Sequence, residues 1–199
     1  MSLFTKTAEG TAPSYVLDAA RSRFEVRAVA TGMLSAFGHN PTIAIRGFTG
    51  EAWFRAQSPE QSSLRIEIDA ASLAVIGDVN QKDRQEMERT MKDEVLETSR
   101  YPQIRFESSG MEASQIAEGM YRMKMLGKLA LHGVERDVEI PCTVTVRDDS
   151  LRTNGEFSIR QTDYHIRPVS AAGGTIKLKD ELKFTFDIAA QRRREAANG

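Results

Sequence analysis

The chain has 199 residues, of which 40% are hydrophobic and 28% charged, and its 27 basic and 28 acidic side chains give a net charge of −1. A chain of this length can bury a core without disulfides or metals, and its charge balance argues against a nucleic-acid or acidic-membrane partner. The single cysteine, Cys142, excludes an intramolecular disulfide.

The first ten residues lack the apolar run of a signal peptide and include an early acid. No later stretch approaches the roughly 20 apolar residues that a membrane-spanning helix needs. We therefore expect a soluble, cytoplasmic protein with no membrane span. Residues 1–13 and 191–199 show no regular apolar period, so we expect a flexible N-terminal tail, one domain at 14–190 and a charged C-terminal tail.

Between these tails, apolar and polar residues alternate. Leu64, Ile66 and Ile68, for example, interleave with Arg65 and Glu67. Because strand side chains alternate between two faces, such segments have one dry and one wet face, which is typical of antiparallel sheet. We expect strands near 22–30, 41–47, 51–57, 63–70, 103–110, 120–132, 134–147, 151–161 and 175–189.

Turn chemistry separates the predicted strands. The sequence Arg147-Asp148-Asp149-Ser150 is typical of a tight hairpin turn, and Gly47-Phe48-Thr49-Gly50 of a short connection. Long segments such as 120–132 favour a tilted, closed barrel over a small sandwich, and closure removes exposed sheet edges.

One segment, from Asn80 to about Glu94, has a longer period. Its apolar residues share one side of a helix: Met87, Met91 and Val95. Either Asn80 or Asp78 is a suitable N-cap. The apolar stripe is narrow, so we expect a helix that lies across an opening of the barrel.

Five patches together resemble the YceI-like family. They occur in the family's order and are Tyr15-Val16-Leu17-Asp18 with Ser22-Arg23-Phe24-Glu25-Val26, Tyr101-Pro102-Gln103-Ile104-Arg105-Phe106-Glu107-Ser108, Gly127-Lys128-Leu129-Ala130-Leu131-His132-Gly133-Val134, Phe157-Ser158-Ile159-Arg160-Gln161-Thr162-Asp163-Tyr164, and Lys179-Asp180-Glu181-Leu182. The resemblance covers roughly residues 15 to 190. It implies an all-β, eight-stranded, lipocalin-like barrel with an elongated apolar cavity that binds polyisoprenoids, quinone-type lipids or other amphiphiles.

The chain departs from the family pattern in two places. Many relatives begin with an export signal, which this sequence lacks, so a periplasmic carrier role is not carried over. Relatives often have Asp-x-His-Leu on the helix, where this chain has Glu88-Arg89-Thr90-Met91. No role of that histidine is therefore assigned.

The candidate ligand-binding residues are those on the dry faces of the expected strands and helix. They are Phe24, Val26, Ile43, Ile45, Phe54, Ile66, Ile68, Met91, Ile104, Phe106, Met123, Met125, Leu129, Phe157, Ile159, Phe184 and Phe186. Taken alone, each is more typical of plain core than of a ligand contact, because an eight-stranded barrel is either filled by its side chains or holds one small ligand. His39, Arg160 and His165 are candidates for contact with a ligand head group at the barrel mouth.

Catalytic and metal motifs are missing from the sequence. His39, His132 and His165 lack metal-ligand spacing, Cys142 falls on a dry face, and no nucleotide-binding or nucleophile motif is present. We expect no catalytic residue, no cofactor and no metal. Two other readings stay open: an enzyme that uses His39, Arg160 and His165, or a filled barrel that binds a partner chain or forms a homodimer near an outward-facing Trp53.

Overall fold

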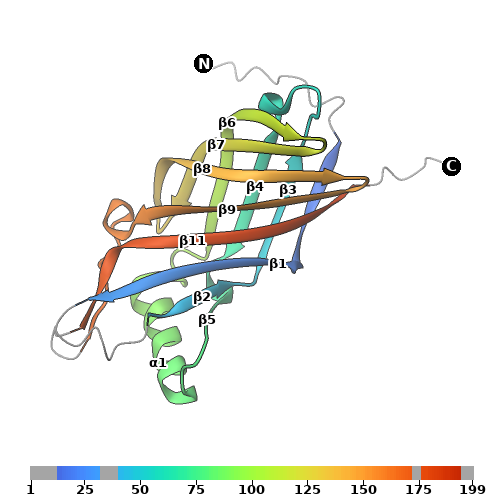
Figure 1. Cartoon of the computed structure of the whole chain (residues 1–199). Helices are drawn as coiled ribbons and strands as arrows, with labels where there is room; N and C mark the ends of the chain where they lie inside the picture. Colours follow the sequence, from blue (N-terminus) through green and yellow to red (C-terminus); the bar gives the residue numbers. More distant parts are fainter. Residues whose placement is uncertain (1–12, 32–39, 172–175, 194–199) are drawn as a thin grey trace.

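The computed structural model describes residues 13–31, 40–171 and 176–193 and consists mainly of antiparallel strands (Figure 1). The strands are β1 (Ser14–Thr31), β2 (Thr42–Ile45), β3 (Phe48–Trp53), β4 (Ser63–Asp69), β5 (Leu73–Ile76), β6 (Gln103–Ala117), β7 (Met120–Leu131), β8 (Val134–Arg147), β9 (Ser150–Arg160), β10 (Ser170–Ala171) and β11 (Ile176–Arg192). The helical segments are α1 (Gln81–Thr90), a π-helical turn η3 (Met91–Val95) and the short 3-10 turns η1 (Pro59–Gln61), η2 (Ala70–Ser72) and η4 (Gln161–Tyr164).

The sheet closes on itself. Its main wall runs β1-β3-β4-β6-β7-β8-β9-β11, and β11 pairs with β1 to complete eight antiparallel strands. Alternate residues of each strand therefore face the interior, where the apolar core lies. The structure confirms the predicted eight-stranded, lipocalin-like barrel with one α-helix.

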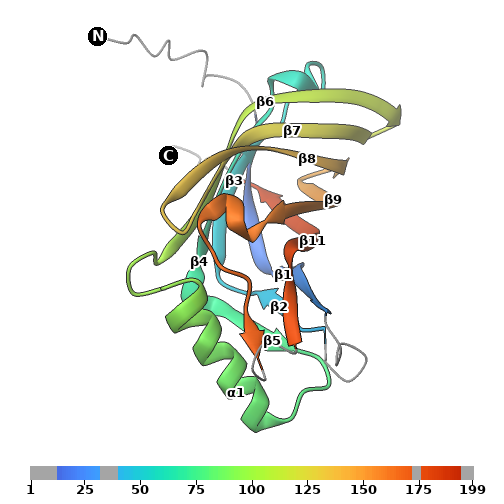
Figure 2. The same ribbon diagram turned by 90° about the vertical axis from the view of Figure 1, so that its left-hand side faces the viewer.

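One side of the barrel bends away from the wall. Ile45 of β2 pairs with Leu73 of β5, whereas Phe48 of β3 pairs with Ile68 of β4. The segments 45–48 and 68–73 therefore both kink between these two pairs. Before the kink, β4 pairs with β3 and β6. After it, β5 pairs with β2 alone among the described strands. Helix α1 packs beside β5 at this open seam, as Figure 2 shows.

The predicted turn at Gly47–Gly50 is wrong, because Phe48, Thr49 and Gly50 belong to β3. Phe48 is buried and packs edge-on against Phe24, with ring centroids 6.2 Å apart. At Gly50, an added Cβ would lie 2.6 Å from Leu17 Cδ1. The glycine is therefore a close-packing position of the wall rather than a turn residue.

The helix begins where the sequence predicted. The Asn80 side chain accepts a hydrogen bond of 3.0 Å from the backbone N–H of Asp83, which is the geometry of an N-cap. The predicted hairpin between β8 and β9 is also present, with Arg147 paired to Ser150. At the other end of the chain, β11 includes Gln191 and Arg192, which the sequence analysis placed in the C-terminal tail.

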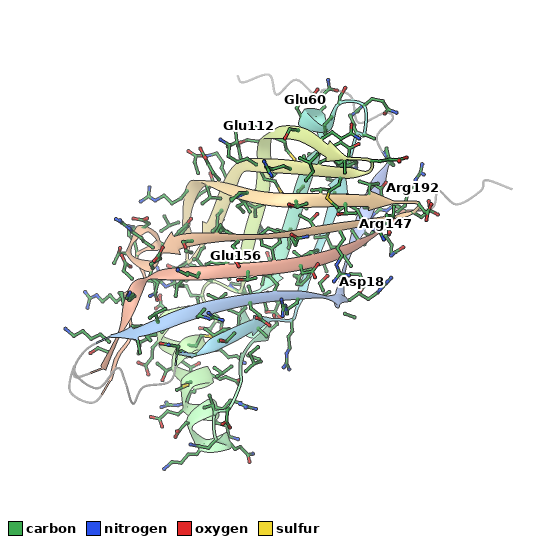
Figure 3. All side chains as sticks on the ribbon, viewed as in Figure 1. Asp18, Glu60, Glu112, Arg147, Glu156 and Arg192 are labelled. Carbon is green, nitrogen blue, oxygen red and sulfur yellow. The ribbon has the colours of Figure 1, made fainter. Side chains whose placement is uncertain are left out.

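The outer face of the barrel is charged. Glu112, Glu156 and Arg147 are exposed and lie on the outside in Figure 3. Ion pairs link neighbouring strands there, such as Lys124 Nζ with Glu112 at 2.9 Å. No helix in the described ranges is long and apolar enough to cross a membrane.

Candidate ligand cavity

The interior of the barrel holds a cavity of about 580 Å³. It extends from Met87 on α1 to Leu151, which follows the hairpin at the opposite end of the barrel. An engineered apolar cavity of roughly 150 Å³ holds a benzene molecule. The interior therefore has room for an elongated ligand several times that size, and the barrel is hollow rather than filled.

The candidate ligand contacts from the sequence converge on this cavity. All of them except Met123 border it: Phe24, Val26, Ile43, Ile45, Phe54, Ile66, Ile68, Met91, Ile104, Phe106, Met125, Leu129, Phe157, Ile159, Phe184 and Phe186. Met123 is buried in register with Cys142 and does not border the cavity. Contact with a ligand stays a prediction for each of these residues.

Aromatic rings form much of one wall. Phe157 and Phe184 stack with centroids 4.7 Å apart and an angle of 15° between the ring planes. Phe24 meets Phe186 edge-on at 6.2 Å. These contacts, of the offset and edge-to-face kinds that aromatic pairs favour, hold the rings against the strands.

A glycine lies beneath one of these rings. Gly155 of β9 pairs with Phe186 of β11, and an added Cβ at Gly155 would lie 2.7 Å from Phe186 Cζ. The ring therefore occupies the space that a side chain at position 155 would need. This arrangement lets Phe186 lie close to the backbone and leaves the centre of the barrel open.

The helical side of the cavity is formed by the predicted apolar stripe. Met87, Met91 and Val95 all border the cavity. Leu73 and Val75 of β5 join them, and both are buried. The strands expected from the sequence do not include β5, although the apolar run 73–76 that precedes Gly77 is a signal for a short buried strand.

Few polar groups border the cavity, and none of them is among the predicted ligand contacts. The neutral ones are Ser62, Ser63, Thr90, Thr153 and Gln161, and the charged ones are Asp83 and Glu86 on α1. Gln161 is only 3% exposed, so its amide is a buried polar group beside an apolar space. Its Nε2 donates a hydrogen bond of 2.9 Å to the carbonyl of Lys179.

The candidate head-group residues lie elsewhere. His39 falls outside the described residues. Arg160 and His165 are exposed and do not border the cavity. His165 instead ends the turn η4 in the left-handed conformation, with φ of 58°.

The Cys142 thiol and the His132 imidazole are placed for structural roles rather than for chemistry. Cys142 is buried, and burial raises the pKa of its thiol to about 12. His132 lies 2.8 Å from Glu97 through Nε2 and 3.2 Å from the carbonyl of Tyr164 through Nδ1. His132 therefore ties the chain after η3 to the turn η4.

Trp53 is half-buried and borders the cavity, whereas its phase along the strand predicted the outer face.

Within the described ranges, no three His, Cys, Asp or Glu side chains lie together as a metal site.

A closed antiparallel barrel of eight strands, with an apolar cavity and a helix across one opening, defines the lipocalin-like class of ligand-binding folds. The model of the YceI-like domain matches residues 15–190, and the chain belongs to the YceI-like family.

Solved structures share the fold at low sequence identity. BcnA of Burkholderia cenocepacia has a TM-score of 0.67 and 19% identity, over 88% of this chain and 99% of its own. A polyisoprenoid-binding domain from Saccharophagus degradans has a TM-score of 0.62 and 13% identity, over 92% and 100%. A YceI protein of Campylobacter jejuni has a TM-score of 0.60 and 18% identity, over 79% and 88%. Among the curated proteins, none matches this chain in sequence.

Proposed function

We propose that the protein binds and sequesters or carries an amphiphile with a long apolar chain, such as a polyisoprenoid, a quinone-type lipid or a fatty-acid-like molecule, inside the barrel. The observation that carries this proposal is the cavity of about 580 Å³ lined almost entirely by apolar side chains. Its size falls within the roughly 300–1,000 Å³ of small-molecule sites. A structural relative described as a polyisoprenoid-binding domain supports the same class of ligand.

We propose binding rather than catalysis. Arg160 and His165, two of the three polar residues that an enzyme would use, are exposed and do not border the cavity, and the third, His39, falls outside the described residues. The buried thiol of Cys142 has a raised pKa, which disfavours the thiolate that a nucleophile needs. A location in the cytoplasm stays a prediction from the sequence, as does a homodimer.

The first experiment is mass spectrometry of an organic extract of the purified protein, followed by titration with isoprenoid alcohols of increasing length. We expect a co-purifying amphiphile and an affinity that rises with chain length until the cavity is full. Each buried methylene contributes about 0.8 kcal/mol. A clean extract together with no binding at any length would contradict the proposal.

A matched pair of variants tests where the chain lies. Thr153 borders the cavity, and its neighbour Asn154 on β9 is exposed on the outer face. Thr153→Trp should shorten the chain length at which affinity stops rising, whereas Asn154→Trp should leave it unchanged. Equal effects of the two substitutions would place the binding site outside the barrel.

A second pair of variants separates a carrier from an enzyme. Arg160→Ala and His165→Ala should each change the affinity by about 1 kcal/mol or less, the scale of one hydrogen bond. Chemical conversion of the ligand that disappears with either substitution would instead establish an enzyme, because loss of a catalytic group removes turnover.

A further inference from the structure

The strongest polar feature of the cavity is the side chain of Gln161, which follows the last residue of β9. The residue is 3% exposed and borders the cavity. Its backbone carbonyl accepts from the N–H of Ile166 at 3.1 Å, which fixes the turn that carries it.

The orientation of the Gln161 amide is fixed by its partner. The carbonyl of Lys179 can only accept, so the atom 2.9 Å away must be the Nε2 donor of Gln161. The other amide atom, Oε1, receives no hydrogen bond from any described residue, and one N–H of Nε2 also stays unused. An acceptor without a partner beside the cavity is open to a hydrogen-bond donor that a ligand brings.

The charge around the cavity restricts what that donor is. Among the described residues, no lysine or arginine borders the cavity, while Asp83 and Glu86 do. The segments 32–39 and 172–175 also contain no lysine or arginine in their sequence. Among the described residues, a phosphate or carboxylate head group would therefore meet carboxylates and no lysine or arginine, whereas a neutral group meets no such repulsion.

The position of Gln161 also sets the direction of the bound chain. β9 starts at the hairpin after Arg147 and ends beside Gln161, so Gln161 lies at the end of the barrel opposite that hairpin. Thr153, which also borders the cavity, lies eight residues earlier on β9, roughly 26 Å away at 3.3 Å per residue. If the polar head group of a ligand lies at Gln161, its apolar tail can extend along the length of the cavity.

We propose that Gln161 is the contact for the ligand's head group, and that this head group is neutral and donates a hydrogen bond, as a hydroxyl does. This inference rests on the proposed function, since it names the polar end of the amphiphile that the barrel binds. The tail then runs toward Thr153 and Leu151.

The test uses three probes with the same farnesyl chain: farnesol, farnesyl methyl ether and farnesyl phosphate. Titration of the wild type should give farnesol an affinity about 3- to 10-fold higher than the ether, the scale of one hydrogen bond. Farnesyl phosphate should bind more weakly than farnesol. Gln161→Met, which keeps the length of the side chain and removes the amide, should reduce the ratio of farnesol to ether affinity to about one. Because each ratio is taken within one variant, a general loss of packing cancels.

The control is Thr153→Val, which removes a polar group at the far end of the cavity and should leave the ratio unchanged. In the wild type, the side-chain N–H resonances of Gln161 should shift with farnesol and less with the ether, so the inference stays testable even where the variant does not fold. An unchanged ratio in Gln161→Met, or tightest binding of the phosphate, would overturn the inference while leaving ligand binding intact. Failure of all three probes to bind would contradict both the inference and the proposed function.

Discussion

The carboxylate of Glu88 on α1 accepts a hydrogen bond of 2.9 Å from the backbone N–H of Val75 on β5. β5 pairs with β2 on its other side, so Glu88 occupies the edge at which the barrel wall is interrupted. A carboxylate that accepts from a backbone N–H makes one of the stronger kinds of hydrogen bond. This contact joins the helix to the wall, and we call residues 81–95, which comprise α1 and η3, the lid.

Removal of this contact should loosen the lid. α1 has no buried residue of its own, and Met91 of η3 is the buried anchor that follows it, so the lid should open at low free energy. Glu88→Ala should speed amide exchange across residues 81–95 and leave the strands unchanged. An apolar ligand should slow exchange in the wild-type lid.

Gln85→Ala is the matched control, because Gln85 is exposed on the same helix and has no hydrogen bond among the described contacts. Exchange that is equal in the two variants would mean that Glu88 does not hold the lid. Exchange that is equal with and without ligand would mean that the helix is a fixed plug and that the ligand enters elsewhere.

Phenylalanines at the cavity should be less costly to truncate than those in the packed wall. Phe48 is buried and does not border the cavity, so Phe48→Ala should lower the free energy of unfolding by about 3–5 kcal/mol. Phe184 is half-buried and borders the existing cavity, so Phe184→Ala should cost clearly less, because part of the space that the ring leaves is already empty. Phe106→Ala should also fall below Phe48→Ala.

Equilibrium urea unfolding without ligand measures these differences. The comparison of Phe48 with Phe184 is matched in chemistry, because each substitution removes the same ring. Losses as large at both Phe106 and Phe184 as at Phe48 would show that the two rings are packed as ordinary core, and that the cavity closes when it is empty.

The thiol of Cys142 should resist alkylation in the folded protein. Burial raises its pKa to about 12, so at pH 8 only about one thiol in 10⁴ is ionised, and the thiolate is the reactive form. Labelling with iodoacetamide should be slow in buffer and fast in denaturant. Rapid labelling in buffer would show that the barrel opens often at this position.

A relocated cysteine is the control for that experiment. The double variant Cys142→Ala, Thr143→Cys moves the thiol to the neighbouring residue, whose side chain faces away from the interior and is partly exposed. Its thiol should label in buffer at a rate close to that of an ordinary cysteine. The ratio of the two rates then reports the protection that the interior gives.

The long strands of the barrel were predictable because their alternation is strict. On β7, Met125, Leu129 and Leu131 face inward and are buried, while Lys128 between them is exposed. A period of two is the direct signature of one dry and one wet face. The strands it predicted agree closely with β4, β7, β8 and β9, while β1 and β6 extend beyond their predicted ends, into residues whose polarity is mixed.

The seam of the barrel was not predictable by the same reasoning. β5 is four residues long and entirely apolar, so it offers no alternation. Its inner face borders the cavity, and its free edge is covered by α1 through Glu88. Burial on more than one side removes the polar residues that a period-two pattern needs.

The polar part of the site was hidden for a different reason. The predicted strand 151–161 includes Gln161 in phase with the inward-facing Phe157 and Ile159, but glutamine is usually exposed, so Gln161 was not predicted as a cavity residue. Its burial results from the turn η4, which brings it beside Lys179 of β11. Such a contact between distant residues depends on the closed sheet and leaves no local trace in the sequence.

The final prediction concerns acid stability and the pair Asp187–Arg152 on the outer face of β11 and β9. Arg152 donates two hydrogen bonds to the Asp187 carboxylate, at 2.6 and 2.8 Å, and this interaction lowers the pKa of Asp187 below its usual value. A carboxyl whose pKa is lower in the folded state stabilises the protein above its unfolded pKa of about 3.9, and the contribution is lost as the pH falls through the folded pKa. Asp187→Asn should therefore lower the free energy of unfolding at pH 7 by about 0.5–1 kcal/mol, the upper range for a pair exposed to solvent. The difference from the wild type should shrink below about pH 4.

Urea unfolding of the wild type and Asp187→Asn from pH 7 to pH 2.5 measures this difference in the free energy of unfolding. The control is Asp78→Asn, at an exposed residue before α1. A difference between Asp187→Asn and the wild type that stays constant over this range would show that the pair contributes through packing and not through charge.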